Sequence, residues 1–510
     1  MSDHATPSTS VENGPRFLGH PVGLFYLFFA ELWERFSFYG MRALLKLYMI
    51  YKVFEALSNG DAVSSIVYAS YGSLVYASPI VGGRIADQIL GYRRSITLGG
   101  ILMAIGHFVL AIENDYAFYI ALAFIVVGNG FFKPNISTFV GTLYPKGDRS
   151  KDSGFTIFYM GINIGAFASP LLCGYLAEAY GYHWGFGLAG VGMMLGLLAF
   201  QYGIRKGVFL DRGLPPSEEA LNKKVLGIPN KTFVPLVAVL FVPVIALILS
   251  NYHYLFSEST VVDVIFMVMT VGILGYLIYV LAQVTAEERG KLIVAILITS
   301  FMTMFWGFHE LSGDTLTIFA ERNVSLSFIN ASQTNSLNPL FIILFSIPMS
   351  WVWVKMSQKG INPRTPFKFA FGLLLLGASF LLLAFSRNFG DADGQVPMMF
   401  LVGMYLLISL GELFMSPVGL SKITDLSPAR IVAFMMGVWF LSSAYAFRIV
   451  GVVGKALAVE SEGGEAVVGS TETLNLYTGG FQTIAYIAIG AAAVVFLLSP
   501  LMNRWMRDVH

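Results

Sequence analysis

Charged residues and cysteine are scarce in this sequence. Only 12% of its 510 residues are Asp, Glu, Lys or Arg, and Cys173 is the only cysteine. A soluble domain needs much more charge to cover its surface, so a soluble globular protein is excluded. A single cysteine excludes an intramolecular disulfide. The formal net charge of +1 provides no field that would attract nucleic acid, so no nucleic-acid partner is expected.

Motifs for metal binding, nucleotide binding and catalysis are also missing. The His and Cys residues show no metal-ligand spacing, and no GxxxxGK[ST] motif is present, so we expect neither a metal site nor ATP as the energy source. No nucleophile, base and orienting group occur together, so an enzyme would need chemistry inside the membrane. The first residues, MSDHATPSTSVENGP, lack the basic start and short apolar core of a signal peptide.

Long apolar runs are what the sequence contains in abundance. Hydrophobic residues make up 56% of the chain, and the mean hydropathy is +0.68. The runs are roughly 20 residues long, which is the length that a helix needs to cross a bilayer. We therefore predict an all-α polytopic membrane protein with 14 transmembrane helices. The spans are expected near 20–50, 62–88, 94–112, 117–138, 153–179, 183–203, 231–250, 260–283, 291–320, 336–356, 366–386, 396–420, 432–456 and 477–503.

Basic residues collect in alternate loops, which indicates that both termini face the cytoplasm. The longest polar break, 206–230, separates six spans from eight, and the two spans that follow it are almost free of charge. Two similar bundles around a midplane site are typical of transporters. The expected domains are a disordered cytoplasmic tail (1–18), an N-terminal six-helix bundle (19–205), a cytoplasmic linker (206–230), an inserted lipid-facing helical pair (231–285), a C-terminal six-helix bundle (286–505) and a cytoplasmic C-terminus (506–510).

The stretch ELWERFSFYGMRALLK, residues 31–46, carries five charged side chains inside an apolar run. An ionisable side chain at the bilayer centre costs about 2.5–3.5 kcal/mol on insertion scales. At about 100° per residue, the polar side chains fall in one helical stripe roughly 140° wide. We expect the stripe to line an aqueous cavity, and the alternative is a buried ion-pair network that only fixes helix packing. The stripe comprises Glu31, Glu34, Arg35, Tyr39, Arg42 and Lys46.

ELWERFSFYG matches the ExxERFxYYG signature of the proton-dependent oligopeptide transporter (POT or PTR) family of the major facilitator superfamily. The resemblance continues in GGRIADQILGYRR (82–94), GNGFFKPNIS (128–137), FTIFYMGINIGAF (155–167), SLNPLF (336–341), GELFMSPVGLS (411–421) and MMGVWFLSSA (435–444). It covers nearly the whole chain and implies the major facilitator fold. The inserted helical pair resembles bacterial members. Phe38 departs from the pattern, because the family often has a tyrosine at this position.

Two pairs of buried charges lie at matching depths in the expected spans. Lys133 and Glu412 both fall about 24 Å from the outer surface, so we expect them to bridge the bundles on the cytoplasmic side. Arg42 matches Glu310, or Asp314 one turn later, near the outer surface. Two such pairs on opposite sides of a cavity are what alternating access needs. Static bridges within one packed state are the alternative.

The resemblance implies how a short zwitterionic peptide would be held. Arg35 and Lys133 would bind its carboxylate, and Glu412 its amino terminus. Asn163 and Asn338 suit peptide N–H and C=O groups. The resemblance adds Arg42, Glu310 and Ser416 to the substrate-binding set. Pocket walls are expected from an aromatic set that would otherwise be ordinary packing: Tyr39, Tyr76, Tyr159, Trp306 and Trp439.

The expected function is that of a proton-coupled symporter that imports di- and tripeptides across the inner membrane by alternating access. It would use the proton gradient and no cofactor. Glu31, Glu34, Arg35 and Glu310 are the expected proton-coupling residues. His107 and His309 are interpreted as packing residues, with a proton role for His309 as the alternative. The competing functions are a carrier of nitrate, drugs or other small anions, and, outside transport, a receptor or a membrane enzyme.

Overall fold

A computed structural model describes residues 15–145, 148, 150–252, 260–415 and 419–506. Within these residues 14 helices contain 17 or more residues, and each overlaps one of the 14 expected spans, which confirms the predicted all-α polytopic fold. These helices are α1 (Val22–Tyr48), α2 (Gly60–Ile85), α3 (Gly91–Leu110), α4 (Asp115–Thr142), α5 (Lys151–Tyr180), α6 (Tyr182–Arg205), α8 (Asn230–Ser250), α9 (Thr260–Gln283), α10 (Ala286–His309), α12 (Leu337–Gln358), α13 (Thr365–Phe385), α14 (Met399–Met415), α16 (Val432–Ala456) and α17 (Ser470–Met506).

Ten of the described helices are long and apolar enough to cross a membrane by length and composition alone. α1 is not among these ten, because Glu31, Glu34 and Arg35 interrupt its apolar sequence. These charged residues belong to the stripe that the sequence predicts at residues 31–46.

Short elements connect the long helices. The helical ones are η2 (Met49–Val53), η3 (Ala86–Leu90), α7 (Glu218–Asn222), η5 (Glu310–Gly313), α11 (Thr315–Asn323), η6 (Ser332–Ser336), η7 (Ser386–Phe389), α15 (Gly419–Leu426) and η9 (Ala429–Ile431). The strands pair as β1 (Arg16–Phe17) with β2 (His20–Pro21), β3 (Lys224–Val225) with β4 (Ile228–Pro229), and β7 (Ser461–Glu462) with β8 (Glu465–Ala466), all antiparallel. β5 (Val324–Ser325) and β6 (Val396–Pro397) pair in parallel.

The span expected at 291–320 is a broken helix. α10 ends at His309, a 3₁₀ turn covers Glu310–Gly313, and α11 starts at Thr315. Asp314 between them has φ −126° and ψ −98°, which lies outside the helical region. A break of this kind inside a membrane span is tolerated where protein surrounds the freed backbone groups. It gives Glu310 and Asp314 positions that a continuous helix would not provide.

The chain forms two compact units. Unit 1 comprises Met1–Tyr39, Ser78–Ser169 and Phe186–Ile245, and unit 2 comprises Gly40–Ala77, Pro170–Gly185 and Ala246–His510. This division follows spatial contacts and cuts through α1, α2, α5, α6 and α8. The domains expected from the sequence follow the order of the helices instead, and they stay a prediction.

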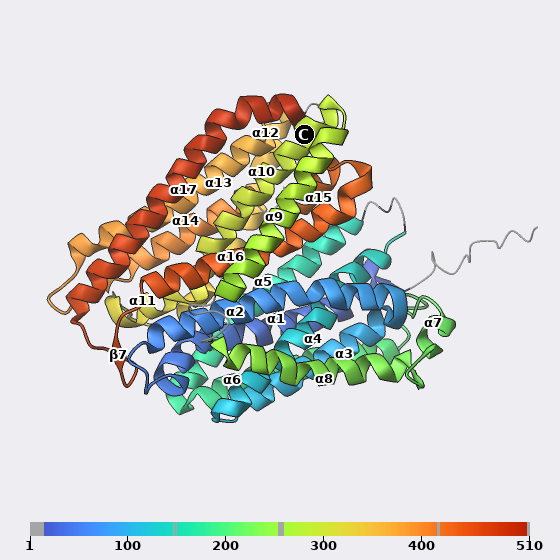
Figure 1. Ribbon diagram of the computed structural model, residues 1–510, viewed down its shortest axis with the longest axis horizontal. Helices are drawn as coiled ribbons and strands as arrows, with labels where there is room; N and C mark the ends of the chain where they lie inside the picture. Colours follow the sequence, from blue (N-terminus) through green and yellow to red (C-terminus); the bar gives the residue numbers. More distant parts are fainter. Residues whose placement is uncertain (1–14, 146–147, 149, 253–259, 416–418, 507–510) are drawn as a thin grey trace, which may run out of the picture. The chain divides into compact units, whose positions relative to one another are not determined.

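Small residues allow close helix packing in unit 1. A Cβ atom on Gly99 of α3 would lie 2.5 Å from the backbone oxygen of Gly128 in α4, so glycine is required where these helices cross. Val234 and Ala238 of α8 join a hydrophobic cluster that includes Leu102 and Phe131, and α8 runs beside α3 and α4 in Figure 1. The first inserted helix therefore packs on this unit.

Unit 2 is built around α10 and α13. α13 packs against α14 and α17, and α10 packs against α16 (Figure 1). α9, the second inserted helix, lies beside α16, where the hydroxyl groups of Thr270 and Tyr445 are 2.7 Å apart. The inserted pair is thus divided between the units, with most of α8 in unit 1 and α9 in unit 2.

Candidate functional site

The charged stripe of α1 forms a compact ion cluster in unit 1. The Arg35 guanidinium pairs with both neighbouring acids: its Nη2 donates to Glu34 Oε1 at 2.6 Å, and its Nε lies 3.3 Å from Glu31 Oε1. All three side chains are buried. Arg35 also lies over the rings of Phe38 and Tyr39, at 5.3 and 5.9 Å from their centroids. Two acids therefore share one cation, and the site carries one negative charge when both acids are ionised.

The other unit 1 candidates come from α4 and α5. Lys133 of α4 is half-buried and interacts electrostatically with Glu31. Asn163 of α5 is buried, and its Nδ2 donates to the backbone oxygen of Tyr159 at 3.0 Å. α5 approaches α1 so closely at Gly165 that an added Cβ atom there would lie 2.3 Å from the Leu32 backbone oxygen. Lys133 and the α1 cluster thus belong to one electrostatic group.

Arg42 and Glu310 form a buried ion pair in unit 2. Arg42 Nε also donates to the hydroxyl of Tyr68 at 2.7 Å, and its Nη2 donates to Ser312 Oγ at 3.3 Å. Of the two partners left open by the sequence, Arg42 contacts Glu310, while Asp314 contacts Lys46. The break after His309 turns Glu310 and Ser312 toward the same guanidinium.

Glu412 on α14 lies among polar and aromatic side chains. Asn338 Nδ2 donates to Glu412 Oε2 at 3.0 Å and to Ser409 Oγ at 2.9 Å. His309 Nε2 lies 3.3 Å from the same Glu412 oxygen. The Glu412 carboxylate is therefore oriented by neighbours from α10 and α12. Lys133 belongs to unit 1 and Glu412 to unit 2, and the expected pairing of these two residues stays a prediction.

The expected aromatic residues of unit 2 have different surroundings. Trp306 packs edge-on to His309, with 4.9 Å between ring centroids. Tyr76 stacks on Phe447 at 5.4 Å. Trp439 on α16 is half-buried, and its backbone oxygen accepts a hydrogen bond from Ser442. Trp306 is the one of these three with a described contact to a neighbour of Glu412. Ser416, the remaining substrate-binding candidate, lies outside the described residues.

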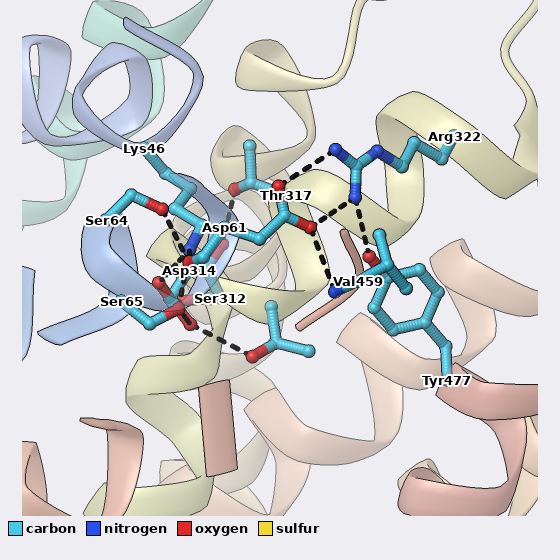
Figure 2. A network of polar contacts seen from close by, with 11 residues as sticks. Lys46, Asp61, Ser64, Ser65, Ser312, Asp314, Thr317, Arg322, Val459 and Tyr477 are labelled. Carbon is cyan, nitrogen blue, oxygen red and sulfur yellow. Dashed lines mark hydrogen bonds and ion pairs between the residues drawn. The ribbon is translucent and has the colours of Figure 1, made fainter. Parts of the chain in front are cut away.

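A second buried network contains ionisable residues for which the sequence analysis predicts no role (Figure 2). Arg322 of α11 donates through both Nη atoms to Asp61 of α2, with a distance of 2.9 Å from Nη2 to Oδ1. Arg322 also donates to the hydroxyl of Tyr477 at 3.2 Å and to the Gly464 backbone oxygen at 3.0 Å. The planar guanidinium suits this two-point contact with a carboxylate.

The same network holds a lysine–aspartate pair. Lys46 Nζ lies 3.0 Å from Asp314 Oδ1 and donates to Ser65 Oγ and to the Asp61 backbone oxygen. Ser65 donates in turn to Asp314 Oδ2 at 3.0 Å. The two cations and two carboxylates of the network balance each other, which is how charges persist away from water. Lys46 belongs to the predicted stripe. Asp61 and Arg322 lie near the ends of helices, where charged residues are common and do not indicate a site.

Among the described residues, no group of three or more His, Cys, Asp or Glu side chains is arranged to hold a metal ion.

Both the sequence and the structure of this chain match those of known proteins. The POT family (PTR2) model matches residues 93–468. The peptide transporter YePEPT of Yersinia enterocolitica is 36% identical over 520 residues, covering 99% of this chain and 98% of the relative. The di-/tripeptide transporter of Lactococcus lactis subsp. cremoris is 36% identical, covering 84% and 88%. A crystal structure of the peptide transporter POT in complex with sulfate has a TM-score of 0.81 and 34% identity, covering 98% of both chains.

The family match and the likeness to a solved peptide transporter, together with long membrane helices and buried ionisable groups, define a multi-pass membrane transporter of the major facilitator type, and not an enzyme. The family match covers more than half of the chain, and relatives above 30% identity span nearly all of it. This chain belongs to the POT family.

Proposed function

We propose that this chain is a proton-coupled symporter that imports di- and tripeptides by alternating access. The similar proteins described as peptide transporters and di-/tripeptide transporters support this substrate class. A short peptide has a fixed zwitterionic backbone and variable side chains. A site that accepts many peptides must therefore hold the two charged ends and leave space between them.

The observation that carries the proposal is the buried carboxylate of Glu412, to which Asn338 donates a hydrogen bond. A carrier of nitrate or another small anion has no use for an oriented carboxylate, whereas a peptide brings an ammonium group to it. Arg35 and Lys133 would bind the opposite end of the peptide, and Arg35 has the guanidinium geometry that suits a carboxylate. Peptide N–H and C=O groups would contact Asn163 and Asn338.

The walls of the site would come from aromatic side chains, which tolerate substrates of varied shape. Arg42, Glu310 and Ser416 complete the proposed substrate-binding set. The aromatic residues proposed for the walls are Tyr39, Tyr76, Tyr159, Trp306 and Trp439.

Proton coupling would act on the acids that pair with arginine. Glu31 and Glu34 share Arg35, so protonating one of them would free Arg35 for the peptide carboxylate. Protonating Glu310 would remove its ionic attraction to Arg42 and favour opening of the outer side. Lys133 with Glu412 would close the cytoplasmic side, and Arg42 with Glu310 the outer side, with Asp314 supporting the latter through Lys46.

The transporter would lie in the inner membrane with both termini in the cytoplasm, as the basic loops indicate. Residues 19–205 and 286–505 would supply the two six-helix bundles, joined by the linker 206–230 and the inserted pair 231–285.

The test is uptake of a labelled dipeptide into liposomes that contain the purified protein, with and without an imposed pH gradient. We expect accumulation above equilibrium only with the gradient. Unlabelled dipeptides should compete, and nitrate should not. Dipeptide binding without flux would indicate a receptor, and competition by nitrate but not by dipeptides would indicate an anion carrier.

A further inference from the structure

His309 is the last residue of α10 and lies directly beside the proposed subsite for the peptide amino terminus. Its Nε2 is 3.3 Å from Glu412 Oε2, and each of the two side chains is 10% exposed. The ring packs against two aromatic neighbours, with Phe305 stacked at 6.0 Å and 28° and Trp306 edge-on at 4.9 Å. Aromatic packing therefore helps to position the contact between imidazole and carboxylate.

The groups next to the His309–Glu412 contact would allow His309 to gain or lose a proton. Asn338 donates to the same Glu412 oxygen but is neutral, so it orients the carboxylate without cancelling its charge. Neither ring nitrogen of His309 makes a hydrogen bond among the described residues, so the approach of Nε2 to Glu412 is an electrostatic contact. A buried ring nitrogen without a protein partner suits an exchangeable proton or a water molecule.

Further charged groups lie near His309 in the chain or on the elements that pack against α10. Glu310, the next residue, pairs with Arg42 of α1, and Arg322 of α11 pairs with Asp61. α16, which packs on α10, carries Arg448 and Lys455 in its second half. The remaining charges on these elements are Lys368 in the first turn of α13, Lys422 and Asp425 of the short α15, and Glu472 and Arg504 at the two ends of α17.

We propose that His309 sets the charge of the amino-terminus subsite by competing with the peptide ammonium for Glu412. With neutral imidazole, Glu412 presents a full negative charge to the ammonium group. When His309 takes a proton, the imidazolium neutralises the same carboxylate, and the peptide loses its partner. Histidine is the side chain whose charge normally changes between pH 5 and 8, so a residue of this type suits such a competition.

The competition is reciprocal. If a proton on His309 weakens the binding of the ammonium group, the bound ammonium group weakens the binding of that proton by the same factor. A peptide that arrives at the site therefore expels this proton. The proposal rests on the proposed function, because it assumes that Glu412 binds the amino terminus.

The test compares a dipeptide with its N-acetylated derivative, which has the same carboxylate but no ammonium group. The measured quantity is the ratio of the two dissociation constants, acetylated over free, at about pH 7 and about pH 5.5, where histidine changes charge. General effects of pH on the transporter act on both ligands and cancel in this ratio. We expect the wild-type ratio to fall roughly tenfold at the lower pH, the size of one lost charge-assisted hydrogen bond.

In His309→Gln the ratio should keep its higher value at both pH values. His107→Gln is the matched control, because His107 is a buried histidine of α3 in unit 1, and this variant should behave like the wild type. A ratio that falls equally in His309→Gln and wild type overturns the proposal. A wild-type ratio near one at both pH values instead overturns the role of Glu412, and with it the proposed function.

A calorimetric measurement on the wild-type protein does not depend on any variant. Binding is measured near pH 6.5 in two buffers that differ in ionisation enthalpy, which gives the number of protons exchanged. The free dipeptide should release more protons than the acetylated one, because only the free ligand competes with the proton on His309. Equal proton exchange by the two ligands would contradict the competition at His309.

Discussion

Lys46 and Asp314 form an ion pair that is shielded from solvent, with 3.0 Å between Nζ and Oδ1 and side chains that are 2% and 0% exposed. Ser65 contacts both members of the pair. α1 and the segment after the break in α10 are joined at this point. A buried charge left without its partner is strongly destabilising, so this pair is expected to respond sharply to substitution.

Removing either member of the pair should destabilise the protein by about 3–5 kcal/mol. Lys46→Met and Asp314→Leu, made singly, would each leave one buried charge unpaired. The double variant should recover most of the loss, because no unpaired charge remains. The measurement is a double-mutant cycle of thermal unfolding in detergent. Lys52→Met is the control, since Lys52 is exposed. A double variant no more stable than the single variants would show that the pair is not coupled.

Asp61→Asn should loosen the contact between α2 and α11, because Arg322 loses the carboxylate that it binds through two nitrogens. We expect a cysteine at Ser64, which is 0% exposed, to react with a water-soluble maleimide roughly tenfold faster in this variant. Replacing Cys173 by alanine first removes the only native thiol. The matched control is Glu462→Gln, which alters an exposed acid. Unchanged labelling would show that the Asp61–Arg322 contact does not hold α2 and α11 together.

Glu34→Gln and Glu310→Gln should each abolish peptide accumulation against a gradient while leaving exchange of internal for external peptide. Glutamine keeps the shape of the side chain but cannot carry the proton that drives transport. Uptake and counterflow in liposomes separate these two activities. Glu55→Gln, at an exposed position, should retain both. Full proton-driven accumulation in both Glu34→Gln and Glu310→Gln would refute the proposed coupling.

Gly454→Ala should destabilise the Lys46–Asp314 region by about 1–3 kcal/mol, because the added methyl group overpacks a dense site. A Cβ atom on Gly454 would lie 2.5 Å from both Asp314 Oδ2 and Ser65 Oγ. Gly437→Ala, on the same helix, is the control, since its Cβ would meet no atom within 4 Å. Alanine favours helix there, so the control should unfold at an equal or higher temperature. Equal unfolding temperatures in the two variants would contradict the packing at Gly454.

Much of the fold could be predicted from the sequence because membrane spans depend on length and hydropathy. The charged stripe of α1 was also predictable, since each ionisable residue in an apolar run is costly and needs a reason. The pairing of Arg35 with Glu31 followed from their four-residue spacing on one helix face.

Contacts between distant segments were harder to predict. Arg42 had two possible partners one turn apart, and depth along a helix is too coarse a measure to choose between them. The choice depends on the break at Glu310–Gly313, which no proline signals. Asp61 and Arg322 gave no signal, because charged residues near the ends of membrane helices usually face water. The sequence predicts a packing role for His309, because its contact with Glu412 joins residues that are far apart in the sequence.

The boundary between the two compact units falls between Tyr39 and Gly40, inside the uninterrupted helix α1. Arg35 and Arg42 are seven residues apart, or about 10 Å along the axis. One continuous helix therefore carries both the Arg35 cluster, for which we propose a role in proton coupling, and the Arg42 and Lys46 bridges. If an acid beside Arg35 gains a proton and the helix rotates in response, Arg42 and Lys46 would move with it. No chain of intermediate side chains is needed to connect the two sites.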